Sequence, residues 1–269
     1  MRRTTLLALA LAAAPAAAQV QLNGAGATFP NIIYQDWILT YGQTHPDVKL
    51  NYQSIGSGGG IRQFSDGTVD FGGSDAPMTD SAIAAIQGNV LHVPTVLGAI
   101  VLTYDLPGVT QQLKFSPDVI AGIFLGTITK WNDARIASIN PGVTLPATDI
   151  VVVHRSDGSG TTYGFTDYLS KVSQDWAQKV GKGPSVNWPV GLGGKGNEGV
   201  ASTVVQTPGG VGYVELGYAT ANKMAFGQVQ NSAGKFVSPT LEAVTASRGP
   251  EVSADADGCS CRLQLRSES

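Results

Sequence analysis

Cysteine is nearly absent from this chain. The 269 residues include only two, Cys259 and Cys261. They lie one residue apart near the C-terminus, where a disulfide between them would be strained. Two thiols alone do not form a structural zinc site either. Packing, rather than cross-links or a zinc ion, must therefore hold the core together.

Charge is also scarce. Charged residues make up 14% of the chain, and the net charge is −3. Because nucleic-acid-binding surfaces are strongly basic, we expect no nucleic-acid partner. An anionic ligand would have to be held by local geometry instead of a global positive field. The three histidines, His45, His92 and His154, are scattered without metal-ligand spacing, so we predict neither a metal site nor a cofactor.

Long apolar runs are missing beyond the N-terminus. Residues 1–18 have the pattern of a cleavable signal peptide, with two arginines, an apolar stretch over 6–14 and three alanines before Gln19. A membrane anchor is the alternative, but the run is too short to span a bilayer. No cysteine stands at the cleavage site. The sequence therefore predicts an exported, periplasmic protein without a lipid anchor.

Glycine is abundant, at 34 residues, and 42% of the chain is apolar. With many short turns, this composition favours an α/β fold over a helical bundle. Strands that alternate with helices predict a mainly parallel sheet. Strands are predicted at 48–53, 150–153 and 211–214, with at most a core strand at 96–102, and helices at 31–41, 116–126, 165–176 and 200–206.

Three glycine-rich segments that carry hydroxyl groups each precede a predicted helix, at 24–30, 54–60 and 155–162. Helix N-termini expose unpaired N–H donors and a partial positive charge. Glycine lets the backbone approach a ligand, and Ser and Thr add donors, so such ends bind phosphate-like anions. One such segment alone is more simply a turn with an N-cap. Three together, one of them carrying Arg155, predict a shared anion site.

Two kinds of charged residue accompany these segments. Arg155 stands between a buried strand and a glycine loop, which suits a bidentate contact to an oxyanion better than an ordinary surface position. Asp157 is placed either to cap the following helix or to hold Arg155. Asp75 also follows a strand-like run, where by itself it is most simply a turn residue.

Signals of catalysis are weak. Ser57 and Ser159 do not lie in a G-x-S-x-G elbow, and the Walker A pattern is absent. Residues 191–196 match G-x-G-x-x-G, with Glu215 about twenty residues further on. However, the stretch 181–189 before them lacks the strand that a dinucleotide loop needs. An exported phosphoryl-handling hydrolase or a nucleotide-dependent enzyme is the alternative to a binding protein without chemistry.

From about residue 23 to 247 the sequence resembles the phosphate-binding proteins of phosphate-specific ABC transporters. The matching words are GAGATFP at 24–30, IGSGGG at 55–60, VDFGGSDAP at 69–77, RSDGSGT at 155–161, WPVGLGGKGN at 188–197 and GYVE at 212–215. The resemblance implies an α/β, two-lobed periplasmic-binding-protein fold, type II-like, with phosphate in the cleft between the lobes. It implies a monomer that is not an enzyme and delivers inorganic phosphate to the membrane permease subunits of an ABC importer.

The resemblance also assigns ligand contacts by matching position. They are Thr28, Phe29 (through its backbone N–H), Ser57, Asp75, Arg155, Ser159, Gly160 and Thr161, with Asp157 as the partner of the arginine. Asp75 would accept a hydrogen bond from protonated phosphate and repel sulfate. Gly58 stands where close relatives often carry Ser, a position outside the principal contacts.

The expected organisation is a first lobe at 19–95, then a second lobe and return hinge at 96–247. The family continues for several dozen residues after the region of Pro239 and so completes its first lobe. Residues 248–269 do not resemble that segment, and their polar composition predicts a disordered tail. The C-terminal part of the first lobe is therefore expected to be missing, as a truncated or shifted reading frame would produce.

Overall fold

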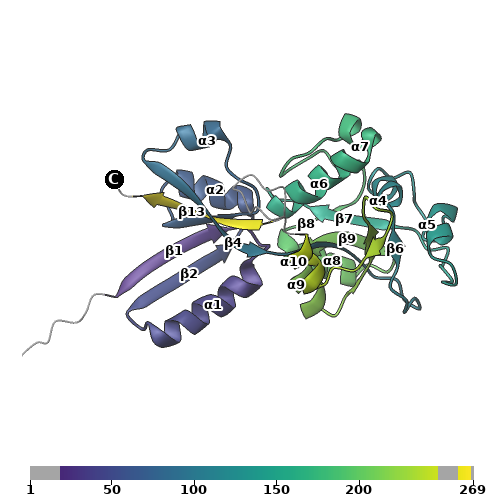
Figure 1. Ribbon diagram of the computed structural model, residues 1–269, viewed down its shortest axis with the longest axis horizontal. Coiled ribbons are helices and arrows are strands. Elements are labelled where there is room, and N and C mark those ends of the chain that lie inside the picture. Colours follow the sequence, from purple (N-terminus) through teal and green to yellow (C-terminus); the bar gives the residue numbers. More distant parts are fainter. Residues whose placement is uncertain (1–18, 248–259, 268–269) are drawn as a thin grey trace, which may run out of the picture.

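The computed structural model of the protein describes residues 19–247 and the backbone of residues 260–267. The chain folds into two lobes, each built on its own five-stranded sheet (Figure 1). The α/β, two-lobed architecture that the resemblance implied is confirmed. The predicted signal peptide, residues 1–18, lies outside the described residues. None of the described helices is long and apolar enough to cross a membrane.

The first lobe is formed by the earliest elements of the chain and by one strand from its end. These are β1 (Val20–Gly26), α1 (Asn31–Thr44), β2 (Val48–Ser54), α2 (Ser57–Ser65), β3 (Phe71–Ser74), α3 (Asp80–Ala84), β4 (Asn89–Leu97) and β13 (Ser260–Ser267). The sheet has the order β2-β1-β3-β13-β4, and β1 pairs in parallel with both β2 and β3. Parallel neighbours need a crossover, which α1 and α2 provide.

The second lobe contains most of the remaining elements. They are β5 (Ile100–Tyr104), β6 (Lys114–Phe115), α4 (Pro117–Phe124), α5 (Ala134–Ile139), β7 (Val151–Arg155), α6 (Gly160–Val172), α7 (Gln174–Lys179), β8 (Leu192–Gly194), α8 (Gly196–Val205), β9 (Gly210–Glu215), α9 (Leu216–Ala221) and β10 (Ala225–Phe226). Its sheet, β10-β5-β9-β7-β8, is parallel among β9, β7 and β8 and antiparallel elsewhere. Both sheets are therefore mixed, where the sequence predicted a mainly parallel one.

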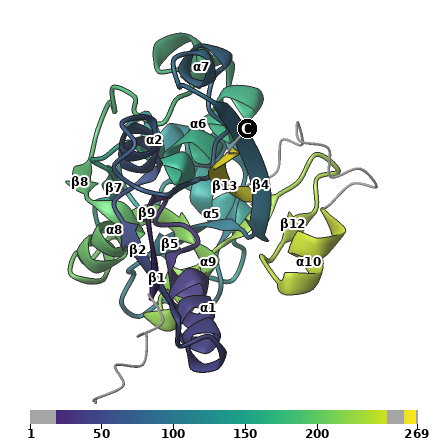
Figure 2. The same ribbon diagram turned by 90° about the vertical axis from the view of Figure 1, so that its left-hand side faces the viewer.

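A small third sheet follows the second lobe. It joins β11 (Gln228–Gln230) to β6 in parallel and to β12 (Phe236–Val237) in antiparallel orientation. The helix α10 (Leu241–Ala246) comes next, and Figure 2 shows it beside β12, to one side of the two lobes.

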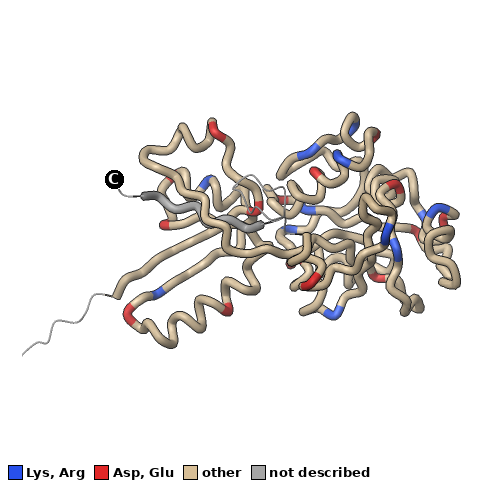
Figure 3. Tube along the Cα trace, in the orientation of Figure 1, with Lys and Arg blue, Asp and Glu red and all other residues tan. Residues whose placement is uncertain are grey.

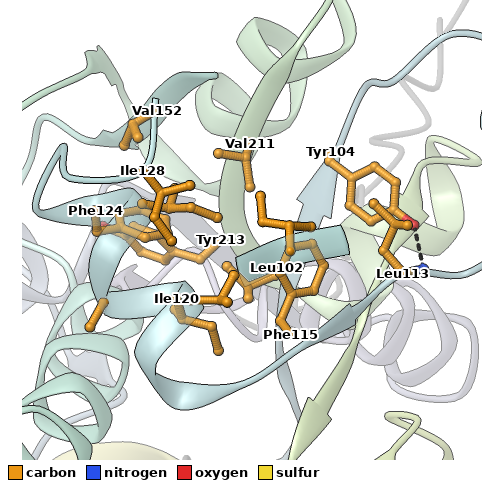
Figure 4. Packing of buried hydrophobic residues seen from close by; sticks show 14 of the residues in the cluster. Leu102, Tyr104, Leu113, Phe115, Ile120, Phe124, Ile128, Val152, Val211 and Tyr213 are labelled. Carbon is orange, nitrogen blue, oxygen red and sulfur yellow. Dashed lines mark hydrogen bonds between the residues drawn. The ribbon is translucent and has the colours of Figure 1, made fainter. Parts of the chain in front are cut away.

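Aromatic side chains dominate the core of the second lobe. Trp131 and Trp176 are fully buried, and Tyr213 stacks on Phe165 with their ring centroids 4.3 Å apart. Figure 4 shows Tyr213 and Phe124 among the packed side chains of this cluster. Full burial of a large apolar side chain contributes about 1.5–3 kcal/mol. This packing holds β7 and β9 firmly in place, and both strands lead to the site described below.

The chain crosses between the lobes at Gly98 and Ala99. The sequence predicted at most one core strand over 96–102, but β4 ends at Leu97 and β5 begins at Ile100. Glycine is required at the crossing because a Cβ on Gly98 would lie 2.8 Å from the ring atom Cζ of Phe29. The first lobe therefore touches the crossover through an aromatic ring.

One predicted helix is divided in two. The apolar positions over 165–176 predicted a single long helix, but α6 ends and α7 begins at Ser173. The Ser173 hydroxyl accepts a hydrogen bond from the N–H of Trp176 at 3.2 Å and so caps α7. A serine at an N-cap competes with helix continuation in this way. The break makes α7 a separate short helix, in which Trp176 is still fully buried.

The tail contributes a strand, so the prediction that residues 248–269 are disordered is wrong for Ser260–Ser267. β13 lies between β3 and β4 and pairs with both in antiparallel orientation. Cys261, Leu263 and Leu265 alternate with polar residues, and this period-two pattern is typical of a strand. Backbone pairing with β13 closes edges of β3 and β4 that would otherwise be open. Residues 248–259 and 268–269 lie outside the described residues.

Large apolar side chains of the first lobe are nevertheless exposed. Trp37 and Leu39 on α1 are 46% and 65% exposed, and Leu91 on β4 is 50% exposed. The resemblance implied that family members carry a longer C-terminus that completes this lobe. Side chains of this size are exposed here where a further element of the lobe could cover them.

We expect that a chimera with residues 248–269 replaced by the C-terminal segment of a family member has a thermal midpoint at least about 5 °C above that of a chimera with a Gly/Ser segment there. Covering one or two such side chains contributes roughly 1.5–3 kcal/mol each, and 1 kcal/mol is worth about 2–4 °C in a chain of this size. Calorimetry would compare this chimera with one that carries a Gly/Ser segment of equal length, since both lack β13. Equal midpoints for the two chimeras would contradict the expectation.

Candidate anion-binding site

Arg155 ends β7, the strand between β9 and β8, and only 4% of its surface is exposed. Its side chain makes a bidentate pair with Asp157: Nε to Oδ1 is 2.7 Å and Nη2 to Oδ2 is 2.6 Å. Burial by itself would raise the pKa of Asp157, but the hydrogen bonds and charge of Arg155 outweigh it and hold that pKa below its usual range. Asp157 thus holds the arginine in one orientation, the second of the two roles that the sequence left open.

The guanidinium retains one buried donor. The Nη1 atom of Arg155 has no hydrogen-bond partner among the described residues. Buried charged donors without a partner are costly, so natural proteins keep few of them. A buried donor that Asp157 orients but does not occupy is suited to an oxyanion.

Two helix N-termini from different lobes meet beside this arginine. Ser57 begins α2 in the first lobe, and Gly160 begins α6 in the second. The Ser57 hydroxyl accepts hydrogen bonds from the N–H of Gly160 at 3.1 Å and from the N–H of Asp75 at 3.3 Å. Ser159 caps α6 by accepting from the N–H of Thr162 at 3.0 Å. Three segments that are far apart in the sequence therefore converge on one point.

Glycines allow the two lobes to close on each other at this point. The N–H of Gly58 donates to the carbonyl of Gly158 at 3.0 Å, across the lobes. A Cβ on Gly160 would overlap the side chains of Asp75 and Ser57. Side chains at these positions would keep the lobes apart, so their glycines serve close approach rather than turn geometry alone.

Asp75 lies at the same junction. The hydroxyl of Thr161 donates to its Oδ2 at 3.3 Å, which joins a first-lobe carboxylate to the second lobe. Thr28, Ser57, Ser159 and Thr161 are all buried. Of the predicted site residues, the structure therefore brings hydroxyls, a carboxylate and an arginine together around two helix ends. Phe29 is buried next to Thr28, with its ring against the crossover.

Asn197 belongs to the site, although the sequence analysis gave it no role. It is fully buried, and its Nδ2 donates to the hydroxyls of Thr28 at 2.7 Å and Thr161 at 3.2 Å. Its Oδ1 accepts from the N–H of Glu215 at 2.9 Å. The residue lay inside a matching word of the sequence, but only the fold shows that it joins the two lobes.

The three glycine-rich segments differ in their local structure. Residues 24–26 are the end of β1 rather than part of a loop, and residues 57–60 already form the first turn of α2. The loops that join each strand to its helix are therefore shorter than the predicted segments, at 27–30, 55–56 and 156–159. The helices that the second and third segments were predicted to precede begin earlier than expected, at Ser57 and Gly160, and their N-terminal ends meet.

Charge around the site is local. Lys, Arg, Asp and Glu are scattered along the described chain, and long uncharged stretches run through the first lobe (Figure 3). An anion would therefore be held by fixed dipoles, hydroxyls and Arg155 rather than by a basic surface.

The G-x-G-x-x-G match has an unsuitable context. Residues 181–191 form no strand, and the motif itself supplies the short β8 before α8. The N–H of Gly196 donates to Oδ1 of Asp157 at 3.1 Å, so this segment supports the arginine pair. Within the described ranges, no group of three or more His, Cys, Asp or Glu is placed to hold a metal ion.

Comparison with known proteins identifies close relatives. A family profile described as "PBP superfamily domain" matches residues 12–256. The chain is 49% identical over 247 residues to "Phosphate-binding protein PstS" of Pasteurella multocida, covering 91% of this chain and 71% of the relative. It is 50% identical over 228 residues to the protein of the same name from Xylella fastidiosa, covering 84% and 62%. The chain thus spans somewhat under three quarters of the length of these relatives.

Solved structures share the fold at lower identity. A phosphate ABC transporter substrate-binding protein from Clostridium perfringens, with bound phosphate, superposes with a TM-score of 0.69 at 19% identity, covering 91% of this chain and 86% of that one. A phosphate-binding protein from Stenotrophomonas maltophilia gives a TM-score of 0.65 at 20% identity, covering 92% and 79%. At these identities the likeness supports the two-lobed fold.

Proposed function

Because the chain belongs to the family of phosphate-binding proteins within the PBP superfamily, we propose that it binds inorganic phosphate and delivers it to an ABC-type importer. The work of such a protein is capture and delivery, without chemical conversion of the ligand. It acts in the periplasm, where the predicted signal peptide would direct it. We further propose that it is a monomer that is not anchored by lipid and recognises the permease subunits in its closed form.

The observation that carries the proposal is the buried Nη1 donor of Arg155 between the ends of α2 and α6. In the proposed complex, Arg155 donates to one phosphate oxygen while Asp157 holds the guanidinium. The N–H groups at the two helix ends and the backbone N–H of Phe29 donate to other oxygens. The hydroxyls of Thr28, Ser57, Ser159 and Thr161 complete the set. Charge on the ligand is spread over many donors, so no full countercharge is required.

Asp75 has a different task in the proposed complex. A carboxylate can only accept hydrogen bonds, so it suits an oxygen that carries a proton. Phosphate near neutral pH keeps at least one proton, whereas sulfate keeps none. Asp75 would then favour phosphate by its hydrogen bond and oppose sulfate by repulsion.

An exported phosphoryl-handling hydrolase or nucleotide-dependent enzyme remains the alternative. Such an enzyme needs a nucleophile next to a base, or a metal centre. The hydroxyl of Ser57 is a hydrogen-bond acceptor for two backbone N–H groups, and no histidine contact to it is found in the described structure. The site thus has the donors of an anion receptor.

Two measurements on the same preparation test the proposal. Calorimetry with inorganic phosphate is expected to show saturable binding of one phosphate per chain. A phosphate-ester hydrolysis assay run in parallel is expected to show no turnover above a blank without protein. Turnover would favour the enzyme alternative, and absence of phosphate binding would reject the proposed function.

A further inference from the structure

Glu215 is an acidic residue that the resemblance left without a role. It ends β9 in the second lobe, and its side chain is half-buried. Oε2 accepts a hydrogen bond from the N–H of Gly217 at 2.7 Å, at the start of α9. Oε1 faces the crossover between the lobes, because a Cβ on Gly98 would lie 3.2 Å from it. The same Cβ would touch the ring of Phe29, so the carboxylate lies at the junction of both lobes and the crossover.

Backbone contacts fix Glu215 to that junction. Its own N–H donates to Oδ1 of Asn197, and the N–H of Leu216 donates to the carbonyl of Ala99 at 2.9 Å. Asn197 in turn bonds Thr28 of the first lobe. Any movement of the lobes about residues 98–99 therefore changes what surrounds the Glu215 side chain.

The groups that face Glu215 come from both lobes. Asp75 approaches from the first lobe, and its negative charge opposes ionisation of Glu215. Tyr218 faces it from α9, and burial, followed by the charge of Glu198, raises the pKa of that hydroxyl, which stays neutral. Burial above all, and then Asp75, raise the pKa of Glu215 to about 7, against the lowering effect of the Gly217 N–H.

We propose that Glu215 takes up a proton from solvent at Oε1 when the lobes close on phosphate, so that phosphate capture and proton uptake are coupled. The inference rests on the proposed function. In an open form, Asp75 and Phe29 withdraw with the first lobe and water reaches the carboxylate. A solvated glutamate ionises near its ordinary pKa of 4.5. Closure removes the water and returns Asp75, which favours the neutral acid.

The sign of the pH dependence follows from this difference. The closed form has the higher pKa, so it binds more protons than the open form between the two values. Its advantage is complete below about pH 4.5 and is lost as the pH rises through about 7. If the pKa moves between these two values, the contribution of Glu215 to phosphate affinity falls about thirtyfold from pH 5.5 to pH 8.

Calorimetry of phosphate binding in two buffers of different ionisation enthalpy measures the protons taken up. At about pH 6 the wild type should take up close to one proton more than Glu215→Gln, whose amide mimics the neutral acid and can still accept from Gly217. The titration of phosphate itself is common to both proteins and cancels in the comparison. The matched control is Glu242→Gln, because Glu242 is an exposed glutamate on α10, and this control should behave as the wild type.

The ratio of the phosphate affinities of Glu215→Gln and the wild type gives a second readout. Glu215→Gln should bind phosphate about fourfold more tightly than the wild type at about pH 5 and about three hundredfold more tightly at about pH 8, because the wild type must first take up a proton. Equal proton uptake and parallel affinity profiles in the two proteins would overturn the inference while leaving the proposed function intact. Absence of phosphate binding by the wild type would overturn both. If the Gln variant does not fold, Glu215→Ala takes its place in the same comparison, and the wild type should again take up close to one proton more at about pH 6 than this variant.

Discussion

Phosphate binding should weaken by about thirtyfold or more in Arg155→Ala. The arginine supplies the buried Nη1 donor, and its other two side-chain nitrogens are held by Asp157. Truncating one partner of a charge-assisted contact in a closed site typically costs about 2–5 kcal/mol, and about 1.4 kcal/mol corresponds to a factor of ten. Calorimetry with inorganic phosphate measures the change. A loss smaller than about threefold would remove Arg155 from the site.

The second lobe offers a matched control for this experiment. Arg135 pairs with Asp133 in the same way, two residues apart, with Nε to Oδ1 at 2.9 Å and Nη2 to Oδ2 at 2.7 Å. Its side chain is 52% exposed, however, and lies on α5. Arg135→Ala removes an arginine of the same local geometry and should leave phosphate affinity unchanged, because exposed ion pairs contribute little.

Removal of Arg155 alone would also leave Asp157 half-buried without its partner. Such a carboxylate destabilises the fold, which would mimic a loss of binding. The double variant Arg155→Ala with Asp157→Ala removes both charges and should still bind phosphate poorly. Arg155→Lys keeps the charge but loses the fork geometry, so its affinity should fall between those of the wild type and Arg155→Ala. Recovery of full affinity in the double variant would show that the effect of Arg155→Ala came through Asp157.

Sulfate should compete far better with phosphate in Asp75→Asn. In the wild type, the Asp75 carboxylate would face sulfate, which has no protonated oxygen to donate a hydrogen bond. The repulsion between the two negative groups costs several kcal/mol. The asparagine amide can donate as well as accept, so the penalty is removed. We expect the sulfate-to-phosphate affinity ratio to rise by about a hundredfold, since about 2.8 kcal/mol corresponds to that factor.

Competition calorimetry with both anions measures the ratio. The control is Asp66→Asn, which alters an exposed carboxylate at the end of α2 in the same lobe and should leave the ratio as it is. An unchanged ratio in Asp75→Asn would reduce Asp75 to a turn residue. Because Asp75 also faces Glu215, its substitution should in addition lower the pKa of Glu215. The selectivity experiment is therefore best done at about pH 5, where Glu215 is neutral in the closed form of both proteins.

The sequence by itself indicated most of the residues of the proposed ligand set. Strand-to-helix segments rich in Gly, Ser and Thr are local features, since the donors at a helix N-terminus belong to residues adjacent in the chain. Ser57, Arg155 and Gly160 were identified on this basis and by family resemblance, and the structure brings all three together. Asp157 was also placed correctly beside Arg155, because residues two apart at the end of a strand are neighbours in any fold.

The secondary structure followed from sequence to the extent that it was local. Helices and strands with clear periodicity were found near their expected positions, including β2 and β7. The predicted helices and strands were wrong where contacts with distant parts of the chain decide the secondary structure. Capping at Ser173 divides a predicted helix, and the crossing at Gly98 interrupts a predicted strand. β13 was missed because its alternation covers only a few residues, and a segment this short forms a strand here by pairing with β3 and β4 on both sides.

Only the tertiary structure decided which groups act across the lobes. Asn197 becomes a link because α8 of the second lobe places it against Thr28 of the first. Glu215 becomes a candidate proton acceptor because the crossover sets it beside Asp75, 140 positions earlier in the sequence. Electrostatic and hydrogen-bond coupling depend on distances in space and on exclusion of water. The sequence fixes neither for residues so far apart, so this coupling is a property of the fold alone.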